Sequence, residues 1–247
     1  MVTPKHYPKA PITEAIIDLR VRPRADLKLE QLKSLRNGEE LAYPKLEGIY
    51  EAVGTLEVQV GVSASASAQQ NQTGFKFASE DGKYVWQTRI NGFTFSRLAP
   101  YEDWEQFRDE ARRLWALYRQ RVAPIETCRL AVRYINRVDL PSGPVDLKDY
   151  FRTSPEVSPD LPQELAGFFM QVRIPQMDLG AQVLINQTII PPAREGVVSV
   201  VLDIDVFRDE NVAKDEAAIW EFFEQLHDRK NEVFEACITD RSRELFQ

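Results

Sequence analysis

Apolar and polar residues alternate along much of this chain, which is the pattern of β-strands with one buried and one solvated face. Such alternation, or a short apolar run that is also typical of strands, occurs at residues 11–21, 56–62, 75–78, 84–90, 93–98, 128–140, 167–174, 181–190 and 197–207. Asn91-Gly92 separates two of these runs, and Asn-Gly in this position indicates a two-residue hairpin. The pattern therefore predicts an antiparallel meander. We expect loops at 39–54, where Pro44 would break a helix, and at 63–74, where small polar residues predominate.

Two longer stretches, 101–121 and 215–236, have apolar residues at the spacings of an amphipathic helix. The expected buried stripe of the first helix consists of Trp104, Phe107, Ala111, Leu114, Trp115 and Tyr118. The expected stripe of the second consists of Trp220, Phe223, Leu226 and Phe234. A shorter helix is expected after Asp26, which we interpret as its N-cap.

The two long helices share a spacing of aromatic residues. When Trp104 is aligned with Trp220, Phe107 falls on Phe223 and Tyr118 falls on Phe234. Chance explains this match about as well as an internal duplication of a unit in which a strand meander precedes one helix. Under either interpretation the order of elements predicts an α+β fold, with an antiparallel sheet, or two such sheets, backed by two long amphipathic helices.

The stretch 142–164 is rich in Pro, Ser and Asp, which is typical of a connecting segment. We therefore expect a first α+β half over residues 1–141, the connecting segment over 142–164 and a second α+β half over 165–247. The sequence leaves open whether the halves form one compact domain with one sheet or two separate sheets.

The net charge of the 247-residue chain is −7, which argues against a broad attraction to nucleic acid or to an anionic membrane. No stretch approaches the roughly 20 apolar residues that span a bilayer. Charged residues interrupt every apolar run near the N-terminus, so no signal peptide is indicated. We accordingly expect a cytoplasmic protein, with buried free thiols at Cys128 and Cys237.

The sequence contains no phosphate-binding loop, dinucleotide fingerprint or nucleophile-elbow motif, and we predict no cofactor. Neither His6 nor His227 has a partner at metal-ligand spacing. Asp203 and Asp205 share one face of a predicted strand. A solvated strand face is the simpler interpretation of this pair, and an Mg²⁺ site or an acid–base pair is the alternative. The balance favours a protein that is not an enzyme, without deciding the question.

Arginines recur on the predicted polar face of the sheet, which suggests a binding surface for an anionic ligand. The candidate binding residues are Arg20, Arg89, Arg97, Arg133, Asn136 and Arg137. The competing interpretation is that acidic residues on the same face form cross-strand salt bridges with these arginines; they are Asp18, Glu57, Asp139, Asp203 and Asp205.

Four sequence motifs, taken in order, resemble a known family. They are Pro11-Ile12-Thr13-Glu14-Ala15-Ile16, then Phe95-Ser96-Arg97 before Pro100-Tyr101-Glu102-Asp103-Trp104, then Arg133-Tyr134-Ile135-Asn136-Arg137, and Phe234 followed by Ile238-Thr239. Together they resemble a sporadically distributed prokaryotic family of conserved hypothetical proteins of similar length. The resemblance implies a cytoplasmic prokaryotic protein and supplies no activity and no catalytic residue. The patchy distribution of that family would suit a mobile or defence-associated gene.

The sequence thus favours a binding or interaction protein that uses the arginine-rich face. Its expected partner is a protein or an anionic ligand, with a homodimer as one form of association; nucleic acid is disfavoured by the net charge, and no membrane partner is expected. One alternative is a metal-dependent enzyme that acts on a phosphorylated or nucleic-acid substrate through Asp203 and Asp205. Another is an antitoxin-like structural partner of a neighbouring gene product.

Overall fold

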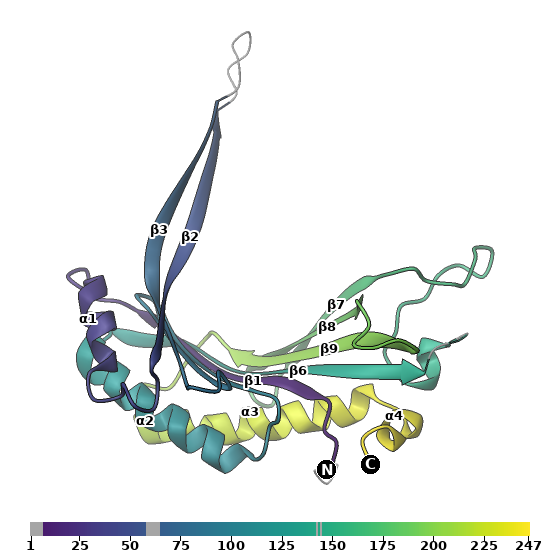
Figure 1. Cartoon of the computed structure of the whole chain (residues 1–247). Helices are drawn as coiled ribbons and strands as arrows, with labels where there is room; N and C mark the ends of the chain where they lie inside the picture. Colours follow the sequence, from purple (N-terminus) through teal and green to yellow (C-terminus); the bar gives the residue numbers. More distant parts are fainter. Residues whose placement is uncertain (1–6, 58–64, 142, 144) are drawn as a thin grey trace.

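The computed structural model describes residues 7–57, 65–141, 143 and 145–247. In this part of the chain, nine strands form one antiparallel sheet, and two long helices pack on one of its faces (Figure 1). In chain order the strands are β1 (Ile12–Arg22), β2 (Lys45–Glu57), β3 (Ser65–Ala78), β4 (Tyr84–Arg89), β5 (Gly92–Leu98), β6 (Glu126–Pro141), β7 (Phe169–Gln176), β8 (Ala181–Ile190) and β9 (Val197–Arg208). The helices are α1 (Leu29–Lys33), α2 (Trp104–Val122), α3 (Glu216–Cys237) and α4 (Asp240–Glu244). The predicted α+β class is confirmed.

The sheet is continuous, and its strand order is β2-β3-β4-β5-β1-β6-β9-β8-β7. The centre is the pairing of β1 with β6, and the next pairing, of β6 with β9, joins strands from the two predicted halves. Ile17 of β1 pairs with Val132 of β6, and Val132 pairs with Val206 of β9. All three side chains are buried, and with the helices they form the hydrophobic core. We call this side of the sheet the helix face.

Each long helix has an aspartate as its N-cap residue and buries its predicted apolar stripe. The Asp103 carboxylate accepts a hydrogen bond from the backbone N–H of Gln106, and Asp215 accepts one from Ala218. These caps satisfy backbone donors that the first turn of each helix leaves free. Helix α2 ends at Ala123, whose φ of 43° is left-handed. The predicted cap at Asp26 is wrong, because α1 begins later, with Lys28 in the N-cap position.

The two predicted loops at 39–54 and 63–74 are largely wrong. Residues 45–57 form β2, and residues 65–78 form β3, which pair with each other over their whole length. Pro44 lies just before β2 and therefore removes no ladder hydrogen bond. The small polar residues of β3 do not prevent pairing because the hydrogen bonds of a sheet come from the backbone. The part of the predicted 56–62 strand beyond residue 57 lies outside the described residues, as does His6.

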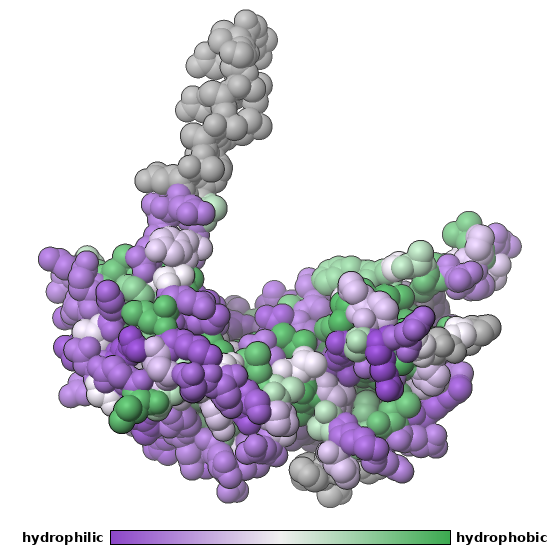
Figure 2. Space-filling model, viewed as in Figure 1, coloured by the Kyte–Doolittle hydropathy of each residue, from purple (hydrophilic) through white to green (hydrophobic). Residues whose placement is uncertain are grey.

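The sheet curves away from the helices, so that its second face is open and concave (Figure 1). The β2–β3 ribbon rises at one end of this face and β7 rises at the other. Figure 2 shows the hollow between them, with hydrophilic and hydrophobic residues mixed along it. We call this side the open face. Its central residues include Asp18, Arg20, Arg89, Arg129, Arg133, Arg137, Asp203 and Asp205.

The structure also shows the surroundings of the two cysteines and of the connecting segment. Cys237 is buried as predicted, but Cys128 is exposed, because it lies near the start of β6 beyond the cover of the core. Within the connecting segment, Phe151 forms a β-bridge with Ile238, which ties the segment to the end of α3. Among the described residues, no helix has the length and apolar character needed to cross a membrane.

Candidate functional site

The arginines of the open face are bound by carboxylates on neighbouring strands. Arg133 donates from Nε and a terminal nitrogen to the two oxygens of Asp203, at 2.8 and 2.6 Å. Arg129 bridges Asp18 at 3.0 Å and Asp205 at 2.8 Å. These contacts realise the cross-strand salt bridges that the sequence offered as the competing interpretation of this face.

At the margins of the network, the arginine and its carboxylate lie on the same strand, two residues apart. Arg20 donates to Asp18, and Arg137 donates to Asp139 at 3.0 Å and to Ser199 at 3.1 Å. Arg89 differs, since it donates to Thr94 and Gln87 and forms no ion pair with the described residues. Burial, and next the positive charge of Arg20, lower the pKa of Arg89. Arg173 of β7 also lies on the open face and, among the described residues, forms no ion pair; its guanidinium lies 5.4 Å from the ring centroid of Phe207.

Asp203 and Asp205 lie side by side on the open face, and arginines occupy both. Burial, opposed by Arg129 and Arg133, raises the pKa of Asp205. One oxygen of Asp205 is buried without a hydrogen-bond partner among the described residues. Across the ranges described above, no three or more His, Cys, Asp or Glu side chains are grouped to hold a metal ion. A metal site at this pair stays a prediction, one that the bidentate Arg133 contact disfavours.

Arg97 and Asn136 lie on the helix face, away from the other candidates. The predicted placement of Arg97 on the polar face is wrong, because Arg97 alternates in phase with Phe93 and Phe95, which are core residues. Its guanidinium lies 4.3 Å from the ring centroid of Tyr84 and donates to Glu102 at 3.3 Å. Asn136 is 2% exposed and donates to the carbonyl of Leu202 at 3.0 Å.

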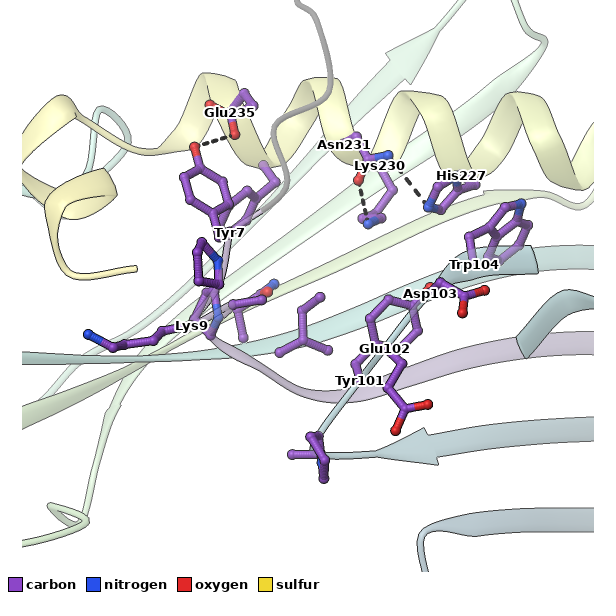
Figure 3. Close-up of a pocket in the computed structure, with 18 residues that line it drawn as sticks. Tyr7, Lys9, Tyr101, Glu102, Asp103, Trp104, His227, Lys230, Asn231 and Glu235 are labelled. Carbon is purple, nitrogen blue, oxygen red and sulfur yellow. Dashed lines mark hydrogen bonds between the residues drawn. The ribbon is translucent and has the colours of Figure 1, made fainter. Parts of the chain in front are cut away.

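Asn136 belongs to a pocket on the helix face with a cavity volume of about 1010 Å³. Its walls are the N-terminal segment 7–12, the loop 99–103 with Trp104, and one side of α3 (Figure 3). This volume is at the upper end of the range for small-molecule sites, roughly 300–1,000 Å³. We call it the Lys230 pocket, after the α3 residue whose side chain points into it (Figure 3).

Helix α3 supplies the polar groups of the pocket from one face. His227, Lys230, Asn231, Phe234 and Glu235 line it, and their spacings of three, four, seven and eight place them on the same side of a helix. Lys230 is also in step with the buried stripe of α3. A lysine at a position of an otherwise apolar helical stripe is the sign of this pocket that the sequence contains.

Lys230 is the least solvated cation of the pocket, with 6% of its surface exposed. Its Nζ lies 3.5 Å from the ring centroid of Tyr134 and donates to Asn231 Oδ1 at 2.6 Å. Among the described residues, no carboxylate forms an ion pair with it. Burial, which the charge of Asp228 only partly offsets, lowers the pKa of Lys230 to about 7. The ammonium thus rests on an aromatic face and an amide oxygen.

His227 stacks flat on Trp104, with ring centroids 4.2 Å apart and planes inclined by 3°. Burial, and next the charges of Lys230 and Arg108, lower the pKa of His227 to about 3. The imidazole is therefore neutral near pH 7. It adds an aromatic wall to the pocket and no charge.

The hydroxyl of Tyr101 and the side-chain amide of Asn136 also belong to residues that line the pocket. The hydroxyls of Tyr101 and Tyr134 lie 2.7 Å apart. Burial raises the pKa of both, so both phenols are protonated near neutral pH. The Asn136 side-chain oxygen, in the part of the chain that the structure describes, accepts no hydrogen bond. The pocket therefore offers hydroxyl and amide groups beside the ammonium.

The carboxylates around the pocket are bound elsewhere. Glu235 accepts from the Tyr7 hydroxyl at 2.6 Å and from Arg243 at 2.9 Å. Burial and the Glu235 contact raise the pKa of Tyr7 to about 12. Asp103 caps α2, and Glu102 accepts from Arg97. None of these groups neutralises Lys230, so its positive charge faces the cavity.

Comparisons with known proteins add no identity to this geometry. No family model matches the chain, and no curated protein matches it. The resemblance drawn from the four sequence motifs stays a prediction.

Proposed function

We propose that the protein is a binding protein for a small organic anion, and that the anion pairs with Lys230 in the Lys230 pocket. The observation that carries the proposal is a lysine, 6% exposed, that borders a cavity and has no carboxylate partner among the described residues. A buried charge is costly unless an opposite charge compensates it. A ligand with a carboxylate or phosphate would supply that charge.

The rest of the pocket supports an anion with an aromatic or apolar body. Tyr7, Tyr101, Trp104, His227 and Phe234 provide rings around the cavity. Ligand sites of this size are typically lined by apolar groups with a few placed polar ones. Lys230 would take the acidic group, and Asn136 would accept a hydrogen bond from a ligand hydroxyl or amine.

The open face is the weaker candidate for anion binding. At its centre, Arg133 and Arg129 pair with carboxylates, so an anion would have to displace Asp203 from Arg133 or Asp18 from Arg129. An interaction with another protein, a homodimer, an antitoxin-like role and a mobile or defence-associated setting remain proposals. They rest on the sequence, as does the expected cytoplasmic location.

The proposed duplication receives support from the strand order. Reading outward from the centre, the first half runs β1, β5, β4, β3, β2 and the second runs β6, β9, β8, β7, so the two orders match apart from the extra outer strand β2. In the chain, a long helix follows β5 and another follows β9. The repeated unit would then begin at β6, before the connecting segment, and not at residue 165.

Thermal unfolding with added phenylacetate or phenyl phosphate at pH 6.5 tests the proposed function. At about 100 times Kd a ligand stabilises by about 2.7 kcal/mol, which for this chain length raises Tm by roughly 5–10 °C. We expect this rise in the unsubstituted protein and in Lys214→Leu, which removes an exposed lysine. Lys230→Leu should abolish it. An equal rise in Lys230→Leu, or no rise with either anion, would contradict the proposal.

A further inference from the structure

We propose that Lys230 captures its ligand covalently, by forming an imine with the ketone of a 2-oxo acid. This inference rests on the proposed function, because the ligand is the same kind of anion: it reacts with the free-amine form of Lys230, and its carboxylate would pair with the positive charge of the protonated imine once that imine has formed. It goes further by assigning a reaction to the amine and a chemical class to the ligand.

Imine formation needs an uncharged primary amine in a protected site. Lys230 Nζ is buried, borders the cavity and is held by no carboxylate of the described chain. A carboxylate of the protein beside this nitrogen would keep it protonated. The Tyr134 ring and the amide oxygen of Asn231 stabilise the protonated form less. Burial lowers the pKa of this lysine to about 7, so near neutral pH about half of the molecules carry the free amine.

The reaction balances with groups that the pocket and the ligand supply. The Nζ lone pair attacks the ketone carbon, the C–N bond forms, and the ketone oxygen becomes the hydroxyl of a carbinolamine. That hydroxyl leaves with a proton as water, and the C=N bond of the imine forms. One water is released, and nothing is oxidised or reduced.

The surroundings of Nζ suit each stage. Protonated imine is a cation, and the Tyr134 ring 3.5 Å below Nζ would stabilise it as it does the ammonium. Asn231 Oδ1, at 2.6 Å, would accept the N–H of the iminium. The hydroxyl of Tyr101, which lines the same pocket, can donate a hydrogen bond to the departing hydroxyl.

Reductive trapping on the full chain tests the inference. The protein is incubated with phenylpyruvate and cyanoborohydride at pH 7, digested, and the labelled lysines are located by mass spectrometry. We expect Lys230 to be labelled at least about tenfold faster than exposed lysines such as Lys214, because only a minute fraction of an ordinary lysine is unprotonated at this pH. The labelling rate should level off just above pH 7, and phenylacetate, which lacks the ketone, should slow it.

The outcomes separate this inference from the proposed function. If phenylacetate raises Tm but phenylpyruvate labels Lys230 no faster than Lys214, covalent capture is wrong and anion binding stands. If neither compound binds and Lys230 is unlabelled, both fail. Lys230→Arg keeps the positive charge without an amine that forms a stable imine. It should retain a Tm rise with phenylacetate and lose the rapid label, and a rapid label elsewhere in the pocket would overturn the assignment to Lys230.

Discussion

The two long helices pack on the same face of the sheet, but equivalent positions in them have different surroundings. Counted from Trp104 in α2 and from Trp220 in α3, Leu114 corresponds to Lys230 and Trp115 corresponds to Asn231. Leu114 and Trp115 are fully buried in a packed core. Lys230 and Asn231 instead border a cavity.

This difference separates the helix that stabilises the fold from the helix that would bind a ligand. In α2 the ring centroid of Trp115 lies 5.6 Å from that of Phe93 and 5.4 Å from that of Tyr118. Aromatic side chains therefore fill the space beside this helix. In α3 the corresponding stripe contains a buried ammonium, which costs stability in the empty protein. The α2 side contributes to the fold, and the α3 side keeps a charge that a ligand can compensate.

The largest effect is expected from placing the α3 residue in α2. Leu114→Lys puts an ammonium into a core position with no cavity, and should lower the free energy of unfolding by about 4 kcal/mol or more. Urea denaturation measures the loss. The control Ala116→Lys places the same residue at an exposed α2 position and should change stability by less than about 0.5 kcal/mol. Similar small losses in both variants would contradict the contrast between the helices.

The reverse exchange, Lys230→Leu, should stabilise the protein, and mainly at low pH. The pKa of Lys230 is about 7 when folded, below the ordinary value near 10.5, so the unfolded chain holds this proton more tightly. The native state therefore bears the full cost of the charge below pH 7 and gains stability as the pH rises from 7 to 10.5. Lys230→Leu should add about 3 kcal/mol at pH 6 and much less at pH 10. Equal effects at both pH values, or a loss at pH 6, would show that the ammonium is compensated in the empty protein.

The open face should behave as structure. Arg133→Met leaves Asp203, which is 5% exposed, without its bidentate partner, and should cost about 2 kcal/mol. The double variant Arg133→Met with Asp203→Leu should recover part of that loss. Neither change should alter the Tm rise with phenylacetate, measured relative to each variant alone. A selective loss of the rise in Arg133→Met would move the anion site to the open face.

The smallest effect concerns acid stability. The pKa of His227 is about 3 when folded, below its ordinary value of 6.5, so the stabilisation from neutral imidazole is present above pH 6.5 and is lost as the pH falls toward 3. His227→Gln removes this titration. It should reduce the stability lost between pH 7.5 and about pH 5.8 by about 1 kcal/mol, as measured by urea denaturation at the two pH values. An unchanged loss would show that His227 is solvated.

The sequence allowed prediction of elements whose pattern is local. The stripes of α2 and α3 and the alternation of β4, β5, β6 and β9 depend on residues close in the chain, and they are confirmed. Most of the β2–β3 ribbon was missed. Pro44 suggested a loop where β2 begins, and the polar stretch of β3 pairs through backbone contacts that a side-chain pattern does not reveal. The Arg133–Asp203 pairing was foreseen only as one alternative, since alternation fixes a face but not a partner.

The pocket could not be assembled from the sequence because its walls are distant in the chain. Tyr7, Tyr101, Asn136 and Lys230 come together only through the order of the strands and the docking of α3. Asn136 was selected for a different surface. Lys230 in an otherwise apolar stripe was the one local sign of the site.

The most direct test of the central claim is the titration of Lys230 by NMR, using lysine labelled at the ε-carbon, without and with saturating phenylacetate. Lys230→Arg assigns the resonance. In the free protein, we expect a pKa near 7 for Lys230. With the anion bound, that pKa should rise by at least about two units, because the carboxylate stabilises the ammonium. A free value near 10.5, or a value that phenylacetate leaves unchanged, would contradict the claim that the Lys230 pocket holds an uncompensated charge for an anionic ligand.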